Sequence, residues 1–175
     1  VRRLADRWDR VTVFTRPGSD RRLLEGVPVR YAEGDLLNEA EVTAAFAGNR
    51  FEYVIVAVRV EDGDPHFYGK FLPGLTAQAK AVGVLQLIHH GAVGAGRNAE
   101  KFPNLGWEKV PGLLDRLKDQ GVGESIVRAS GVPFTIVRPA IVESSTYFPF
   151  AGWNEGINTT GPLLFTSQRG QVQIP

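Results

Sequence analysis

The chain has 175 residues, of which 43% are hydrophobic and 22% charged, and this composition is typical of one compact globular domain. A formal net charge of +1 excludes the strong basic field of a nucleic-acid-binding protein. The absence of cysteine excludes disulfides, thiol nucleophiles and thiolate zinc sites, and is compatible with a cytoplasmic location. No apolar run approaches the roughly 18 residues of a membrane-spanning helix.

The first part of the chain predicts the end of a helix, two strands and a second helix. Residues 1–8 show the spacing of a helix end, and the β-branched and aromatic run 11–15 predicts a buried strand. Residues 27–32 predict a second strand. Asn38 is expected to cap the next helix, with Glu41 as its reciprocal partner.

Strand and helix patterns continue to alternate through the middle of the chain. Residues 53–58 form a near-continuous apolar run, typical of a strand at the centre of a sheet covered on both faces. This order predicts βαβ units, and therefore an α/β fold with one doubly wound parallel sheet and helices on both faces. The elements that follow are a helix over 68–82 interrupted at Pro73 and Gly74, a strand over 84–89, a helix over 107–129 with a break at Gly121, and a strand over 134–137.

The alternation ends after Val142. Residues 147–161 are aromatic and rich in Gly, Pro and Asn, with no sustained period. This composition favours a functional loop on the substrate side of the protein. The alternative is an aromatic patch that packs against a C-terminal part expected beyond this sequence.

Residues that directly follow the strands are the candidates for a binding site, because ligands of open α/β sheets bind at the carboxyl ends of the strands. Thr15 and Arg16 end the first predicted strand, where dinucleotide-binding folds contact the adenosine ribose. A guanidinium there suits the 2′-phosphate of NADP, whereas a carboxylate would suit the 2′-hydroxyl of NAD. Arg16 therefore favours NADP, with NAD kept open; the alternative is a solvated arginine in a turn.

Two further strand ends offer cofactor contacts. Asp35 can accept a hydrogen bond from the adenine amino group, and Leu36 can cover the ring. The motif that suggests these contacts, Gly34-Asp35-Leu36, is only three residues long. Ala57 and Val58 end the central strand, where small residues let a nucleotide lie against the backbone. A plain core strand explains Ala57 and Val58 equally well.

The strand that ends at His90 leads into a glycine-rich turn from Gly91 to Gly96. Its glycine order differs from the dinucleotide fingerprint, so we expect the turn, with His90 and Gly91 at its start as cofactor contacts, to pass under the nicotinamide and its ribose. His89 and His90 are adjacent on a strand and point to opposite faces, which argues against a metal site. No metal is expected.

The sequence resembles the short-chain dehydrogenase/reductase superfamily in its atypical or extended, NmrA-like branch. The resemblance covers roughly residues 1–142, and its most specific stretch is Ser130 to Ala140. It implies an NAD(P)-binding Rossmann domain over 1–142 that lacks its first strand and glycine-rich loop, and contacts from Pro139, Ala140 and Ile141 to the nicotinamide.

A second stretch, from Ile141 to Asn158, resembles the corresponding segment of fatty acyl-CoA reductases. We therefore interpret residues 143–175 as a substrate-side loop region, incomplete at its C-terminal end. In this region Phe150 and Trp153 are the candidates for the wall of an apolar substrate pocket.

The family's Tyr-x-x-x-Lys motif is not present in its expected register, where Arg116 and Gln120 stand instead. Lys118 could substitute if the break at Gly121 rotates the helix, although a solvated lysine is the simpler reading. His90 stands where a serine of the family often orients substrate, and its imidazole could donate a proton. A structural, hydrogen-bonded histidine is the alternative.

Two functions follow as hypotheses. The first is an NADP-dependent oxidoreductase that reduces a carbonyl or an activated double bond of a small apolar substrate. The second is a non-catalytic NmrA-like regulatory protein that binds the dinucleotide as a redox sensor. No feature fixes the oligomeric state, and a homodimer is compatible with the sequence.

Overall fold

The computed structural model describes residues 1–7, 10–58, 64–101 and 111–139, and the single residues 146, 150, 151 and 169. The chain divides into two compact units, Val1–Arg138 and Pro139–Pro175. All the helices and strands described below belong to the first unit. None of the described helices is both long and apolar enough to cross a lipid bilayer.

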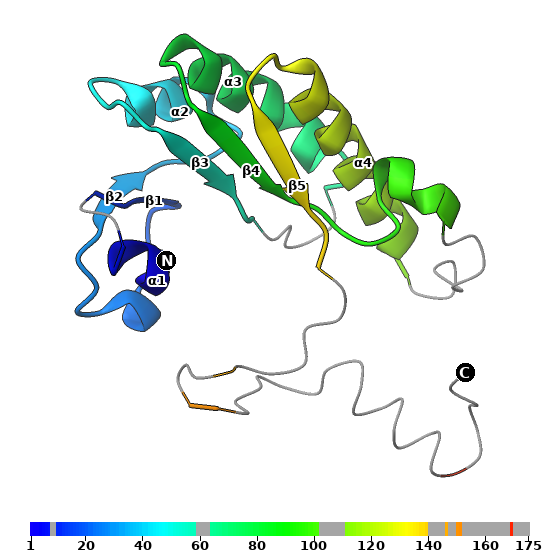
Figure 1. The fold of residues 1–175 in the computed structure, drawn as a ribbon, viewed down its shortest axis with the longest axis horizontal. Helices are drawn as coiled ribbons and strands as arrows, with labels where there is room; N and C mark the ends of the chain where they lie inside the picture. Colours follow the sequence, from blue (N-terminus) through cyan, green and yellow to red (C-terminus); the bar gives the residue numbers. More distant parts are fainter. Residues whose placement is uncertain are drawn as a thin grey trace. The chain divides into compact units, whose positions relative to one another are not determined.

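The first unit is built from parallel strands that alternate with helices (Figure 1). Strand β1 pairs with β2 in one sheet, while β3, β4 and β5 form a second sheet in that order. The strands are β1 (Thr12–Thr15), β2 (Arg30–Glu33), β3 (Tyr53–Val56), β4 (Gln86–His90) and β5 (Phe134–Val137). The predicted α/β class with parallel strands is confirmed.

The expectation of one sheet centred on residues 53–58 is wrong for the described part of the chain. Strand β3 is an edge strand, because it pairs with β4 only, and β1 pairs with β2 only. No described residue pairs along the second edge of either strand. The centre of the three-stranded sheet is β4.

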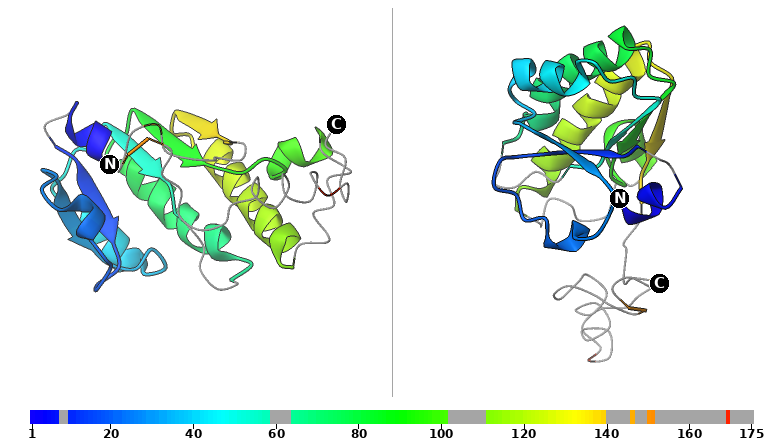
Figure 2. Two further views of the ribbon diagram at one scale, coloured as in Figure 1. Left: turned by 90° about the horizontal axis from the view of Figure 1, so that it is seen from below. Right: turned by 90° about the vertical axis from the view of Figure 1, so that its left-hand side faces the viewer.

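Helices α2 (Glu39–Phe46), α3 (Phe67–Ala81) and α4 (Leu113–Ala129) form one layer behind the strands (Figure 2). Two helical layers were expected, but on the other face of the three-stranded sheet Tyr53, Ile55 and Val137 are 48%, 45% and 45% exposed. The described helices therefore cover one face only. The remaining short elements are α1 (Arg2–Ala5) and the 3-10 turns η1 (Arg22–Leu24) and η2 (Gly96–Lys101).

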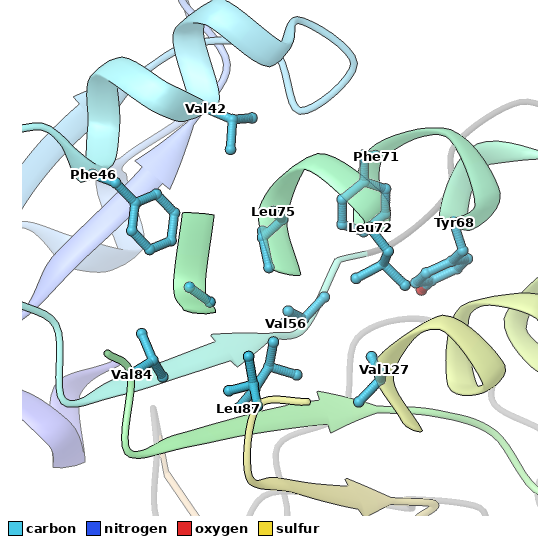
Figure 3. Packing of buried hydrophobic residues seen from close by; sticks show 12 residues of the cluster. Val42, Phe46, Val56, Tyr68, Phe71, Leu72, Leu75, Val84, Leu87 and Val127 are labelled. Atoms are coloured by element: carbon cyan, nitrogen blue, oxygen red, sulfur yellow. The ribbon is translucent and has the colours of Figure 1, made fainter. Parts of the chain in front are cut away.

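The hydrophobic core lies between the sheet and this helical layer (Figure 3). Period-two alternation directs Val56 of β3 and Leu87 of β4 into it, while α3 contributes the largest share. The α3 residues are Tyr68, Phe71, Leu72, Leu75 and Ala79, and all are buried. Burial of such side chains contributes roughly 1.5–3 kcal/mol each before entropy is counted.

Both predicted helix interruptions are wrong. Helix α3 continues through Pro73, because the burial of Leu72 and Leu75 on either side outweighs the roughly 3 kcal/mol cost of an interior proline. Helix α4 continues through Gly121, where a Cβ would lie 2.9 Å from the backbone nitrogen of Gly96. This glycine allows close packing and does not end the helix.

Candidate functional site

The carboxyl ends of β1 and β2 bring Thr15, Arg16 and Asp35 to one edge of the first sheet. The strands are parallel and in register from Thr12 opposite Arg30 to Thr15 opposite Glu33. The carbonyl of Thr15 accepts a hydrogen bond from the amide of Gly34 at 2.9 Å, which holds the two strand ends together. Arg16 and Asp35 are both exposed beyond them.

A second arginine, which the sequence interpretation missed, returns to the same edge. The guanidinium of Arg21 donates to Thr15 Oγ1 at 3.3 Å, forms an ion pair with Glu33 and lies 4.3 Å from the ring centroid of Tyr31. The intervening turn is closed by the hydrogen bond from the amide of Ser19 to the carbonyl of Arg16. The only signal in the sequence was a second basic residue five positions after Arg16.

Asp35 is held by the start of α2. Its Oδ1 accepts from the amide of Leu37 at 2.9 Å, and its own amide donates to Glu41 at 2.6 Å. The predicted cap is confirmed, because Asn38 accepts from the amide of Ala40. Glu41 accepts from the Asn38 side-chain amide at 2.8 Å rather than from its backbone.

Leu36 is half-buried and lines a cleft of about 340 Å³ between α2 and α3.

The carboxyl end of β3 is tied to the start of α3 and to α4. Ala57 is exposed, and the carbonyl of Val58 accepts a hydrogen bond from the Tyr68 hydroxyl at 3.0 Å. Burial raises the pKa of Tyr68, while its hydrogen bond to Gln120 opposes that change. Asp119 of α4 is buried and accepts from the amides of Tyr68 and Gly69 at 2.9 and 3.3 Å.

We expect Asp119→Ala to lower the free energy of unfolding by about 2 kcal/mol. Helix α3 has no side-chain cap of its own, so the substitution would leave the buried amide of Tyr68 and the half-buried amide of Gly69 without this acceptor. The melting temperature should fall by roughly 4–8 °C. Asp115→Ala, an exposed position on the same helix, is the control and should change it little. Equal melting temperatures for the two variants would contradict this role.

The two histidines at the end of β4 face opposite sides, as predicted. His89 is fully buried against Tyr68, with ring centroids 5.6 Å apart, and neither of its ring nitrogens has a hydrogen-bond partner among the described residues. His90 is exposed on the open face of the sheet, and Gly91 behind it is buried. Within the described ranges, no group of three potential ligands is placed to hold a metal ion.

Burial lowers the pKa of His89 below its ordinary value of 6.5; nearby Glu124 opposes the change, and His90 and Arg138 reinforce it. The unfolded chain therefore takes up a proton before the folded chain does, so the protein should lose stability as the pH falls below about 6.5. Urea titrations between pH 7.5 and 5.5 check this. His89→Leu should remove part of the loss, whereas parallel curves for the two proteins would contradict the assignment.

Lys118 is not brought to His90. It lies on α4, in the layer behind the sheet, and its side chain is 75% exposed beside Asp115 at 3.5 Å. Because α4 is unbroken at Gly121, the rotation that would have redirected this lysine does not occur.

The last sequence-predicted contacts fall in the second unit. Pro139 is half-buried and Phe150 is 62% exposed. Ala140, Ile141 and Trp153 lie outside the described residues.

An ion pair between half-buried Arg138 and buried Glu124 joins the end of β5 to α4, and sequence reasoning did not identify it. Arg138 Nε donates to Glu124 Oε1 at 2.7 Å, and Nη2 donates to Oε2. The Glu124 side chain is 2% exposed, and the pairing raises the pKa of Arg138. The available signal was the position of Glu124, seven residues after Leu117 and three before Val127, within the buried stripe of the helix.

The strand ends present groups that fit the adenosine half of a dinucleotide. A guanidinium suits a phosphate, an exposed carboxylate suits the adenine amino group, and the small side chain of Ala57 permits close approach. Together with the parallel βαβ topology, these features define a Rossmann-type nucleotide-binding domain.

Residues 1–147 match the model of the NAD(P)H-binding family, and the chain belongs to this family. It is 31% identical over 153 residues to sterol demethylase protein B of Methylococcus capsulatus, covering 81% of this chain and 47% of that protein. It is also 32% identical over 79 residues to fatty acyl-CoA reductase 2, chloroplastic, of Arabidopsis thaliana, covering 42% of this chain and 13% of that protein. The chain thus spans less than half the length of either curated relative.

Among solved structures, the NADPH complex of the quinone oxidoreductase QOR2 from Escherichia coli superposes with a TM-score of 0.52 at 19% identity, over 79% of this chain and 42% of that one. This likeness concerns the fold. The predicted NAD(P)-binding Rossmann domain is confirmed.

Proposed function

We propose that this protein is an NADP-dependent reductase of a carbonyl group or an activated double bond in a small apolar substrate. The observation that carries the preference for NADP is the exposed guanidinium of Arg16 directly after β1, in a member of the NAD(P)H-binding family. Thr15 and Asp35 complete the adenosine contacts at the same edge. Ala57, Val58 and Gly91 would lie along the rest of the dinucleotide.

The cofactor supplies a hydride when it is bound, so the protein has to bind and orient the cofactor and the substrate and to exclude water from them. His90 is the proposed proton donor, because its imidazole is exposed on the open face at the end of β4. Lys118 is the second candidate, and its exposed side chain would have to leave Asp115 to act. Pro139, Ala140 and Ile141 follow β5 and would contact the nicotinamide.

Among the described residues nothing pairs along the second edge of β1 or of β3, which supports the proposal that one further strand completes the sheet. One parallel strand between them would give the order β2-β1-strand-β3-β4-β5, which is the order of dinucleotide-binding folds. The turn after such a strand would hold the pyrophosphate with backbone amides at a helix N-terminus. Cofactor experiments therefore use the protein expressed from its complete reading frame.

Phe150 and Trp153 are proposed to form one wall of the substrate pocket. Trp153→Ala should lower kcat/KM for apolar substrates about tenfold, because roughly 1–3 kcal/mol of apolar contact is lost in such pockets, and should leave the Kd for NADPH unchanged. Steady-state kinetics and titration of the same preparations measure both constants. A lower melting temperature with intact kinetics would show that Trp153 packs a core.

A redox-sensing role is the second candidate. It is favoured by Arg116 and Gln120 standing in the places of the family's tyrosine and lysine, because a sensor needs the dinucleotide but no proton donor.

One experiment separates the two functions: NADPH oxidation is followed with aldehydes, quinones and acyl-CoA esters as acceptors. Oxidation that depends on one acceptor class supports the reductase. NADPH binding without oxidation by any acceptor would overturn it in favour of the sensor.

A further inference from the structure

The Glu124 carboxylate lies where three elements meet: α4, the turn that follows β4, and the end of β5. Glu124 is 1% exposed, and both of its oxygens are bound by the guanidinium of Arg138. The same two oxygens lie against the backbone of the turn. A Cβ at Gly91 would be 2.8 Å from Oε1, and one at Gly96 would be 2.6 Å from Oε2.

The turn is shaped by this contact. Gly91 and Gly96 leave room for the carboxylate, and Gly96 has a backbone φ of +53°, which residues with a side chain rarely adopt. A Cβ at Gly121, one turn of α4 before Glu124, would meet the Gly96 nitrogen at 2.9 Å, so the helix and the turn touch through backbone. The amide of Gly91 also donates to the carbonyl of Val137 at 2.8 Å. The turn is therefore fixed from the helix and from β5 at once.

A buried ion pair is a weak contributor to stability, because removing two charges from water costs about as much as their attraction returns. A bidentate guanidinium and carboxylate pair does, however, define position closely, since both parallel hydrogen bonds must be kept. Because the Glu124–Arg138 pair lies beside the ends of β4 and β5, it is suited to hold these two strand ends in position.

We propose that Glu124 and Arg138 are positioning residues for the nicotinamide half of the bound dinucleotide, holding the Gly91 to Gly96 turn and the end of β5 in one fixed arrangement. This inference rests on the proposed function, in which that turn underlies the nicotinamide and residues 139–141 contact it. The adenosine half is held by β1 and β2, in the other sheet. Changes to the Glu124–Arg138 pair should therefore weaken binding of the nicotinamide half of the cofactor and leave binding of the adenosine half unchanged.

Two ligands separate the halves. NADPH carries the nicotinamide, whereas adenosine 2′,5′-bisphosphate carries only the adenosine half with its 2′-phosphate. In Glu124→Gln and in Arg138→Lys, we expect the Kd for NADPH to rise about tenfold and the hydride-transfer rate to fall about 100-fold, because a displacement of about 1 Å has that effect on reaction geometry. The Kd for the bisphosphate should stay within about twofold.

Arg128→Gln is the matched control, because Arg128 is an exposed arginine on the same helix, one turn after Glu124. It should change neither Kd. Gly121→Ala provides an independent variant outside the proposed cofactor contacts, since its methyl group would lie 2.9 Å from the Gly96 nitrogen and displace the turn without altering any charge. It should reproduce the selective loss of NADPH affinity.

The outcomes are distinct. Selective weakening of NADPH in folded variants supports the inference. Equal weakening of both ligands, unchanged binding of both, or loss of folding in both Glu124→Gln and Arg138→Lys overturns it and leaves the proposed function intact. Failure of the unaltered protein to bind either ligand overturns the proposed function, and this inference with it.

Discussion

Replacing Arg16 with alanine is expected to weaken NADP binding by about 10- to 100-fold, because hydrogen bonds from a guanidinium to a phosphate contribute roughly 1.5–3 kcal/mol. NAD lacks the 2′-phosphate, so its Kd should change little. The Kd for NAD divided by the Kd for NADP therefore falls by the same factor. Both constants are measured by titration of each cofactor into each protein. A ratio is the informative quantity, because general damage to the fold would weaken both cofactors together.

The neighbouring sequence supplies the control for this experiment. Arg22 has the same charge and is also exposed, with a side chain 83% accessible to solvent that forms an ion pair with Asp20. Arg22→Ala should leave the ratio unchanged. A ratio that is unaltered in Arg16→Ala, or altered equally in Arg22→Ala, would contradict the assignment of Arg16 to the 2′-phosphate.

His90→Ala is expected to lower kcat by about 100-fold or more, since a positioned general acid contributes 10²–10⁴-fold. The Kd for NADPH should change far less, because the imidazole is proposed to act on the substrate. His89→Leu is not a suitable comparison, since that ring is buried in the core. His66→Ala is a better control, because His66 is exposed and lies at the start of α3 rather than in the core or at the end of β4.

The same measurement on Lys118→Ala decides between the two candidate donors. Loss of kcat in this variant alone would assign the role to Lys118 and show that its exposed side chain moves on substrate binding. Full activity in both variants would contradict both assignments and leave water or the substrate as the donor.

The sequence predicted the strands well, because each is a short apolar run bounded by turn residues. Residues 134–137 coincide with β5, and the strand at 53–58 contains β3. The pattern failed where tertiary packing outweighs local preference: Pro73 and Gly121 both lie inside continuous helices. The division into two sheets could not be read from the strands, because pairing depends on which neighbour is available to each edge.

The site was predictable only in part, for a related reason. Residues at or just after the ends of strands can be identified from the chain alone, and this gave Arg16, Asp35 and His90 as candidates. Contacts between distant elements cannot be identified in this way. Glu124 lies on a helix and Arg138 at a strand end, and their approach depends on the glycines of a third element, Gly91 and Gly96. Oppositely charged residues 14 positions apart carry no such signal by themselves.

The central claim is that this protein transfers a hydride from NADPH to an acceptor. It is tested most directly with NADPH deuterated at the transferring carbon of the nicotinamide, incubated with the protein and with aldehyde or acyl-CoA acceptors, followed by mass spectrometry of the products. One carbon-bound deuterium in the reduced product, absent when Arg16→Ala is assayed at a low NADPH concentration, is the predicted result. NADPH that is bound but transfers no deuterium to any acceptor would contradict the account.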